Sequence, residues 1–254
     1  MILRDKFFKD IWIQPASGDA GGALGSALAV WHKELKKPRK IKSSDSMKGS
    51  YLGPSYEQNY IEKELESSGA KFIVTSEDEM IEQTAKALAD GKVVGWFQGK
   101  MEFGPRSLGC RSILADPRSE DMQKMLNLKV KNRESFRPFA PSILKEEVQN
   151  WFELDYDSPY MLLVDNVKKN KRFNVSEEEK NQVGIDLLNV KRSFIPAVTH
   201  VDYSARIHTV STETNPKFYA LINQFKQKTG YPLIVNTSFN VRGEPIVCSP
   251  SDAF

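Results

Sequence analysis

The sequence predicts an α/β fold, and three features of the chain carry this prediction. Residues 77–90 carry apolar side chains at helical spacing and end at Gly91, a residue that commonly terminates a helix. Residues 92–97 form a short apolar run typical of a buried strand. The same order of helix and then strand recurs at 218–228 and 232–236. Helices alternating with short strands indicate helices packed on a sheet.

The first 32 residues predict a strand, a glycine-rich loop and a helix. The strand is expected at 10–15, the loop at 18–22 and the helix, rich in small residues, at 23–31. One strand and one helix cannot bury their apolar faces on each other. We therefore expect this segment to pack against part of a domain that these residues do not include.

A basic and polar stretch at 33–50 predicts a solvated linker between the first segment and a larger domain at 51–254. Beyond it we expect helices at 56–68, 119–130 and 146–152 and strands at 160–164 and 207–210. Residues 168–182 are charged and predict a flexible loop or lid. The last residues, 249–254, begin like a capped helix, so we expect this domain to be truncated at its C-terminus.

Composition and charge exclude several classes of protein. The net charge of +3 is too small to indicate nucleic acid, and the two cysteines have neither a CxxC nor a Cys/His metal spacing. No apolar run approaches the roughly 18 to 20 residues that span a bilayer. The N-terminus also lacks the apolar stretch of a signal peptide. These features predict a cytoplasmic protein with no membrane partner and no nucleic-acid partner.

Basic charge is concentrated at 100–137, where nine Lys or Arg stand against five Asp or Glu. Arg106 and Arg111 lie in a loop rich in glycine and serine, and Lys131, Arg133 and Arg137 precede a Pro-Phe-Ala-Pro run. In such a sequence, backbone amides and guanidinium groups can surround phosphate oxygens. The alternative is a solvated loop with surface ion pairs.

Polar residues also follow the expected strand at 232–236. Asn236, Ser238 and Asn240 would lie at its carboxyl end, where open α/β sheets bind ligands. The alternative is a polar turn that satisfies its own backbone. Asp19 is a candidate metal or ribose ligand, or merely a turn residue. No two of the three histidines share a metal-ligand spacing, so we expect each histidine to be structural.

Four stretches together resemble the C-terminal half of the O-carbamoyltransferases of antibiotic and nodulation-factor biosynthesis: 101–118, 131–142, 158–161 and 236–247. The resemblance covers about 51–254. Residues 18–25 similarly resemble the final strand, loop and helix of that family's N-terminal transfer domain, which has the actin/Hsp70-like ATPase fold. The resemblance implies a YrdC-like twisted α/β domain at 51–254, preceded by the C-terminal tail of the transfer domain at 1–32.

The resemblance also implies a two-step reaction. The YrdC-like domain would form carbamoyl adenylate from carbamoyl phosphate and ATP with Mg²⁺, and the transfer domain would pass the carbamoyl group to a hydroxyl of a sugar-like or antibiotic-like acceptor. Asp19 matches an aspartate that binds an iron-like divalent metal together with two histidines of the N-terminal domain. Because those histidines are outside this sequence, we expect the metal to be absent and the second step not to be completed by this chain alone.

On this basis Arg106, Lys131 and Arg137 are assigned to catalysis at phosphate oxygens, and Arg111 is a weaker member that braces its loop. The residues assigned to binding substrate or nucleotide are Arg133, Arg111, Asn236, Ser238, Asn240 and Ser142. Two alternatives stay open: a threonylcarbamoyl-adenylate synthase of the same fold, and a module that binds RNA or nucleotide without chemistry. Prolines and glycines rather than aromatic residues separate the cations, which disfavours stacking on RNA. A homodimer is compatible with the assignment.

Overall fold

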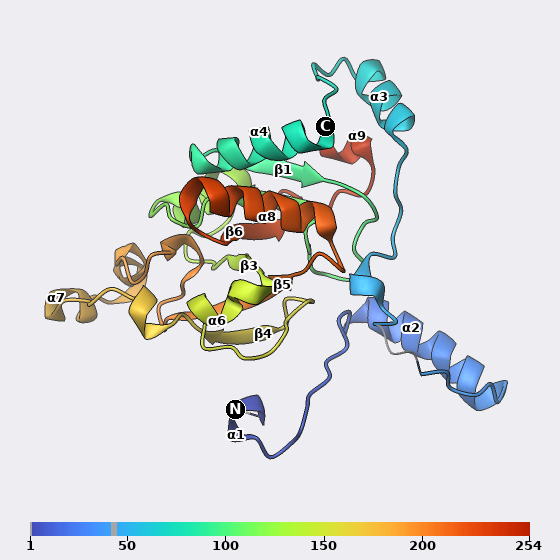
Figure 1. Cartoon of the computed structure of the whole chain (residues 1–254), viewed down its shortest axis with the longest axis horizontal. Helices are drawn as coiled ribbons and strands as arrows, with labels where there is room; N and C mark the ends of the chain where they lie inside the picture. Colours follow the sequence, from blue (N-terminus) through green and yellow to red (C-terminus); the bar gives the residue numbers. More distant parts are fainter. Residues whose placement is uncertain (1, 42–44) are drawn as a thin grey trace.

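A mixed sheet forms the centre of the molecule in the computed structural model, which describes residues 2–41 and 45–254 (Figure 1). Its six strands lie in the order β1 (Val94–Phe97), β2 (Arg111–Ala115), β6 (Leu233–Ser238), β3 (Ala140–Leu144), β5 (Ser204–Val210) and β4 (Leu163–Asn166). The pair β3 and β5 is parallel, and the other four neighbouring pairs are antiparallel. The predicted α/β fold is confirmed, as a mostly antiparallel sheet with helices on it.

Two long helices, α4 (Glu77–Ala89) and α8 (Pro216–Thr229), lie together on one face of the sheet (Figure 1). Each begins at a side chain that accepts a backbone N–H, Ser76 for α4 and Asn215 for α8. The second helix ends at Gly230, whose φ of +80° is the left-handed conformation expected at a helix end. The helical predictions for 77–90 and 218–228 are confirmed.

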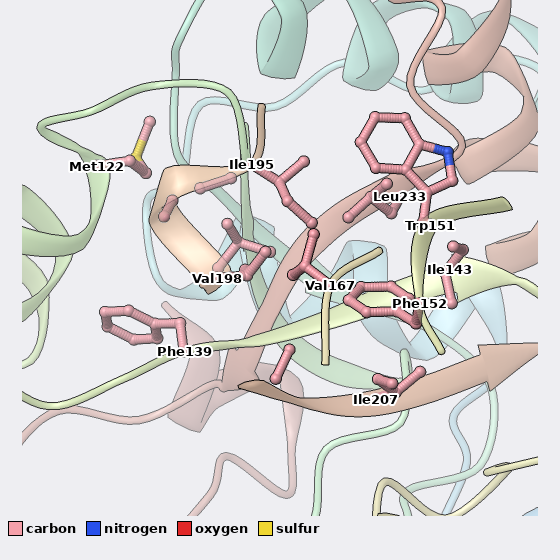
Figure 2. Packing of buried hydrophobic residues seen from close by; sticks show 14 of the residues in the cluster. Met122, Phe139, Ile143, Trp151, Phe152, Val167, Ile195, Val198, Ile207 and Leu233 are labelled. Atoms are coloured by element: carbon pink, nitrogen blue, oxygen red, sulfur yellow. The ribbon is translucent and has the colours of Figure 1, made fainter. Parts of the chain in front are cut away.

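The opposite face of the sheet carries the largest hydrophobic cluster (Figure 2). Phe152 is fully buried there against Ile143, Ile207 and Leu233 of the strands. Short elements cover this face: α5 (Met122–Met125), the π-helix Leu126–Val130, α6 (Val148–Trp151) and the 3-10 turn Pro196–Val198. Burying a side chain such as that of Phe152 contributes about 1.5–3 kcal/mol, so this cluster is a main source of stability.

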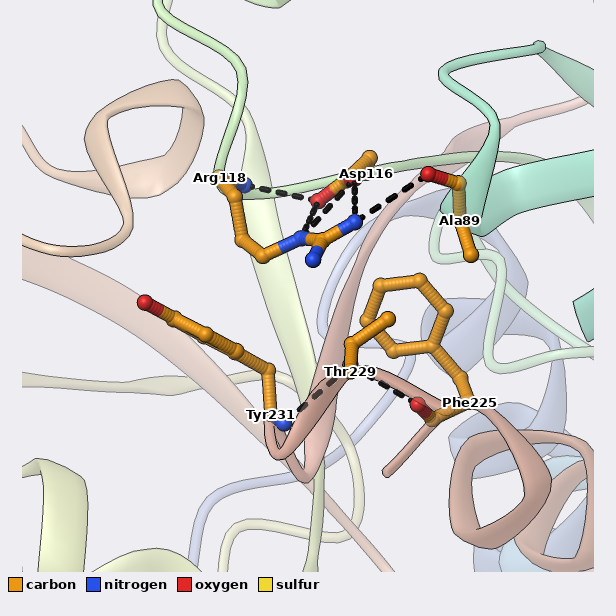
Figure 3. Close-up of polar contacts among 6 residues, drawn as sticks. All are labelled: Ala89, Asp116, Arg118, Phe225, Thr229 and Tyr231. Atoms are coloured by element: carbon orange, nitrogen blue, oxygen red, sulfur yellow. Dashed lines mark hydrogen bonds and ion pairs between the residues drawn. The ribbon is translucent and has the colours of Figure 1, made fainter. Parts of the chain in front are cut away.

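One end of the sheet is braced by Arg118 (Figure 3). Its guanidinium donates to both carboxylate oxygens of Asp116, just after β2, and to the carbonyl of Ala89 at the end of α4. The rings of Phe225 and Tyr231 each lie 5.6 Å from it. These contacts join the ends of β2, α4 and α8 to the start of β6.

The N-terminal segment differs from the prediction. Helix α2 (Asp19–Ala29) continues as the π-helix Val30–Glu34 and projects from the sheet with no buried residue (Figure 1). The predicted strand at 10–15 is wrong, because no second strand of the described chain pairs with it and its Trp12 is 77% exposed. Part of the predicted linker, residues 42–44, lies outside the described residues.

The other elements are short or peripheral: α1 (Ile2–Asp5), α3 (Gln58–Ser67), α7 (Glu177–Lys180), α9 (Pro250–Ala253) and the 3-10 turns Lys48–Ser50, Lys145–Glu147, Lys169–Lys171 and Gly184–Asn189. The predicted loop at 168–182 contains the 3-10 turn Lys169–Lys171 and the short helix α7, and the strand predicted at 160–164 begins at Leu163. Across 2–41 and 45–254, no helix has the length and apolar character needed to cross a membrane.

Candidate functional site

A cavity of about 170 Å³ lies at the end of the sheet opposite the Arg118 brace. Because β6 runs antiparallel to β2 and β3, the carboxyl end of β6 meets the beginnings of those strands there. The prediction of a site at strand carboxyl ends thus applies to β6 alone. The cavity is lined by Pro105, Arg106, Ser107, Arg133, Pro138, Phe139, Ala140, Met161, Arg206, Asn236, Thr237 and Ser238.

Three arginines give this cavity its charge: Arg106 from the loop before β2, Arg133 from the segment before β3, and Arg206 from β5. The buried Nε atoms of Arg106 and Arg206 have no hydrogen-bond partner among the described residues. Burial and the neighbouring charge of Arg106 lower the pKa of Arg206. Among residues 2–41 and 45–254, no Asp or Glu lines the cavity. Buried cationic donors without partners favour binding of an anion.

Arg133 is held in place by its neighbours. Its Nε donates to Oδ1 of Asn127 at 2.7 Å, and its guanidinium lies 5.0 Å from the ring of Phe139. Asn127 is fully buried and donates in turn to the carbonyl oxygens of Ser135 and Arg137. These contacts fix the backbone of the basic segment, so Arg133 meets a ligand with little conformational entropy left to lose.

Lys131 does not line the cavity but supports the turn that does. Its Nζ donates to the carbonyl oxygens of Ser238 and Asn240 and, at 2.8 Å, to Oδ1 of Asn240. The Ser238 hydroxyl donates to the same Oδ1. The ammonium group therefore shapes the end of β6. Arg137 is more remote from the cavity, because its side chain is 53% exposed and pairs with Glu134 at 3.0 Å.

Lys131 gives the protein a specific dependence of stability on pH. Burial, with the nearby charge of Arg133, lowers its pKa from 10.5 to about 8. Between these values the unfolded chain binds more protons than the folded one, so the free energy of unfolding rises with pH. We expect wild type to gain stability over Lys131→Met from about pH 8 to about 10.5, measured by urea denaturation. A constant difference across that range would contradict this pKa.

Arg111 lies outside the cavity and braces the loop that carries Arg106. It is fully buried, its Nη1 donates to the carbonyl oxygens of Gln98 and Cys110, and its guanidinium stacks on Phe97 at 3.5 Å. These contacts use the guanidinium inside the protein. The bracing role assigned to Arg111 agrees with this geometry, whereas direct contact with a ligand in the cavity does not.

Glu102 organises the same loop from inside. Its Oε1 accepts hydrogen bonds from the backbone N–H groups of Leu108, Cys110 and Arg111, at 2.6, 2.8 and 3.4 Å. Burial raises the pKa of the carboxyl group, and these hydrogen bonds oppose the rise. Gly109 has φ of +97°, and a Cβ there would lie 2.3 Å from the Phe218 ring. The loop that carries Arg106 and Ser107 is therefore tied to the core by its own sequence.

Ser142 and Asn236 lie next to each other on neighbouring strands. The Asn236 amide nitrogen donates to the Ser107 carbonyl at 3.1 Å and to the Ser142 hydroxyl at 2.9 Å. Ser142 is in turn 2.7 Å from Nδ1 of His208. Complete burial lowers the pKa of His208 to about 3, so the ring is neutral. Asn236 lines the cavity and Ser142 supports it from behind.

Asp19 stands apart from this site. It is the first residue of α2 and is exposed. Within 2–41 and 45–254, no group of three His, Cys, Asp or Glu side chains could hold a metal ion. A single carboxylate does not retain a transition metal specifically, so the described residues alone do not fit the metal that the resemblance implies.

Arg206 and Glu102 are two charged residues of the site that the sequence analysis did not identify. Arg206 lies 69 residues beyond Arg137 in the sequence, just before the strand predicted at 207–210. Only the pairing of β5 with β3 brings it to the basic segment. Glu102 lies within the basic loop, where a carboxylate is easily taken for a surface residue. Its position between an apolar strand and a glycine-rich turn was the available signal.

A larger hollow of about 640 Å³ lies between the extended residues 9–13 and the loop 155–163. Its charged side chains are those of Lys9, Asp10, Asp155 and Asp157. Three carboxylates against one ammonium make it a poor site for phosphate. The smaller cationic cavity is therefore the candidate site.

Comparison with known proteins identifies related chains. The family model described as carbamoyltransferase C-terminus matches residues 85–254. An uncharacterized protein of Synechocystis sp. is 54% identical across this whole chain, which covers 42% of that protein. Nodulation protein NolO of Bradyrhizobium diazoefficiens is 40% identical over 99% of this chain and 42% of its own length. A 3′-hydroxymethylcephem-O-carbamoyltransferase of Amycolatopsis lactamdurans is 30% identical over 96% and 40%. The chain thus spans about two fifths of the length of these relatives.

Proposed function

Because this chain belongs to the carbamoyltransferase family, whose C-terminal region it matches, we propose that it activates a carbamoyl group for transfer to a hydroxyl. The observation that carries the proposal is the cationic cavity, where the buried Nε atoms of two arginines have no hydrogen-bond partner among the described residues. A phosphorylated carbamoyl donor supplies the oxygens that Arg106, Arg133 and Arg206 require. Carbamoyl phosphate is therefore assigned to this cavity.

The size of the cavity supports a small ligand. Its volume of about 170 Å³ lies below the roughly 300–1,000 Å³ of sites for drug-sized molecules. An acyl phosphate therefore suits the cavity better than a whole nucleotide does. We assign ATP to the adjoining surface, with its phosphates toward the exposed Arg137. Mg²⁺ would accompany ATP, and the described residues do not mark its position.

The proposed chemistry has two balanced parts. Water cleaves carbamoyl phosphate to carbamate and phosphate, and a carbamate oxygen then attacks the α-phosphorus of ATP. The bond between that phosphorus and pyrophosphate breaks, which yields carbamoyl adenylate and pyrophosphate. The arginines neutralise phosphoryl oxygens that would otherwise repel the incoming carbamate, and they do so in a partly dehydrated site. Lys131 keeps Ser238 and Asn240 in place beside them.

The finer architecture is also proposed. The mixed sheet with α4 and α8 on one face is compatible with a YrdC-like domain at 51–254. The projecting helix α2, which has no buried residue, is compatible with the tail of a transfer domain at 1–32. In that arrangement Asp19 would join metal ligands from the N-terminal domain. The acceptor would be a hydroxylated small molecule.

Exchange of labelled pyrophosphate into ATP tests the proposal. We expect this chain with Mg²⁺ to catalyse exchange that depends on carbamoyl phosphate, and Arg106→Ala with Arg206→Ala to abolish it. Arg172→Ala, which changes an arginine outside the cavity, is the matched control and should keep exchange. Absence of exchange by the folded wild type would refute adenylate formation. Exchange that depends on threonine and bicarbonate instead would assign the chain to threonylcarbamoyl-adenylate synthesis.

A further inference from the structure

A turn directly before β5 holds a histidine that the proposed function does not use. The turn is closed by two backbone hydrogen bonds, from the N–H of His200 to the Ser204 carbonyl at 2.9 Å and from the N–H of Tyr203 to the His200 carbonyl at 3.0 Å. Ser204 and Arg206 point to the same face of β5, because side chains alternate along a strand. The Ser204 hydroxyl contacts the His200 ring, so this ring lies beside an arginine that lines the cavity.

The hydrogen bonds of this turn need one more proton than a neutral histidine supplies. The Ser204 oxygen lies 2.7 Å from Oδ1 of Asp202 and 3.2 Å from Nδ1 of His200. Because an ionised carboxylate only accepts, the single hydroxyl hydrogen goes to Asp202, and Nδ1 must carry a hydrogen to donate to Ser204. The ring also makes a hydrogen bond with the backbone of Phe139 that favours the protonated form. A second ring N–H serves that bond, and a histidine carries both only when it is charged.

Burial and a neighbouring cation oppose this protonation. Burial lowers the pKa of His200 below its ordinary value of 6.5, the carboxylate of Asp202 raises it, and the positive charge of Arg206 lowers it again. Asp202 itself is ionised at neutral pH, since hydrogen bonds from Ser204 lower its pKa. The ring is therefore mostly neutral at pH 7 as long as the charge of Arg206 is not offset. An anion beside Arg206 would remove that repulsion and let the ring complete its hydrogen bonds.

We propose that His200 takes up a proton when an anion binds in the cavity, which couples the affinity for phosphorylated ligands to pH. The inference rests on the proposed function, which places phosphoryl oxygens against Arg206. The proton comes from solvent and adds to a ring nitrogen, so no covalent step is involved. His200 acts through Arg206 and is a positioning residue, which goes beyond the structural role expected from the sequence. Because binding and protonation are linked, the protonated protein binds the anion more tightly by the same factor.

Calorimetry with sulfate tests the coupling, because sulfate stays a dianion across the pH range in which His200 titrates. Titrations of the full chain in two buffers with different ionisation enthalpies give the number of protons taken up per bound sulfate. A neighbouring dianion is expected to raise the pKa of His200 by about one unit. The uptake should then reach about half a proton per sulfate near pH 6, and sulfate should bind up to about tenfold more tightly at pH 5 than at pH 8.

His200→Gln should abolish the uptake, because glutamine can donate to the Phe139 carbonyl but does not titrate. His32→Gln is the matched control and should leave the uptake unchanged, since His32 lies on the π-helix Val30–Glu34 that projects from the sheet. The ring NMR signals of wild type give a second measurement that needs no variant. One histidine should titrate at higher pH when sulfate is present.

The outcomes separate this inference from the function on which it rests. Sulfate binding without proton uptake, uptake that persists in His200→Gln, or histidine titrations that sulfate leaves unchanged would each overturn the coupling and leave the proposed function intact. Wild type that binds neither sulfate nor inorganic phosphate would refute the cationic cavity and with it the proposed function.

Discussion

Arg206→Ala is expected to weaken binding of phosphonoacetamide, a stable phosphonate analogue of carbamoyl phosphate, by about 10- to 150-fold, because a charge-assisted hydrogen bond contributes about 1.5–3 kcal/mol. The same loss is expected for Arg106→Ala. Neither change should destabilise the fold, since each removes one of two neighbouring cations and a buried Nε that has no partner in the described part of the chain. Calorimetry gives the affinity, and urea denaturation gives the free energy of unfolding.

Arg172→Ala should show the reverse pattern. Its Nε donates to the Val167 carbonyl at 2.7 Å, its guanidinium pairs with Glu153 at 3.4 Å, and it lies 4.8 Å from the Tyr203 ring. All these partners belong to the protein, so this variant should lose stability and keep the affinity. If Arg206→Ala bound phosphonoacetamide as wild type does, or lost stability as Arg172→Ala does, Arg206 would be a structural residue.

Glu102→Ala is expected to lower the free energy of unfolding by about 2–4 kcal/mol. The change leaves three backbone N–H groups without their shared acceptor in the interior of the protein. It should also weaken anion binding, because the loop that it frees carries Arg106 and Ser107. Glu102→Gln keeps an acceptor oxygen and should recover most of the stability, as measured by urea denaturation.

Glu120→Ala is the matched control for this prediction. Glu120 forms an ion pair with Lys191 in which its side chain is 60% exposed, and such pairs contribute little. Its removal should change neither stability nor anion binding. A Glu102→Ala variant as stable as Glu120→Ala would show that the loop does not depend on the buried carboxylate.

The elements that sequence periodicity predicts well are those with one apolar face and clear ends. Helices α4 and α8 have such faces and stop at Gly91 and Gly230, and strands β1 and β6 are apolar runs beside them. Strand β3 was missed because Pro141 lacks the N–H that a central strand normally uses. Strand β2 was missed because it begins at Arg111, a charged residue that the fold buries completely.

The candidate site was predictable where its residues are close in sequence. Arg106 and Arg133 were identified from the basic cluster, and Asn236 and Ser238 from the polar end of an apolar strand. Arg206 was not, because strand pairing rather than sequence distance brings it to the cavity. For the same reason the sequence could not show that Lys131 supports the turn after β6, nor that Arg111 is used inside the protein.

A crystal structure of this chain with phosphonoacetamide tests the central claim most directly. The account predicts that the phosphonate oxygens lie within hydrogen-bond distance of Arg106, Arg133 and Arg206. A phosphonate bound elsewhere, with this cavity left empty, would contradict it.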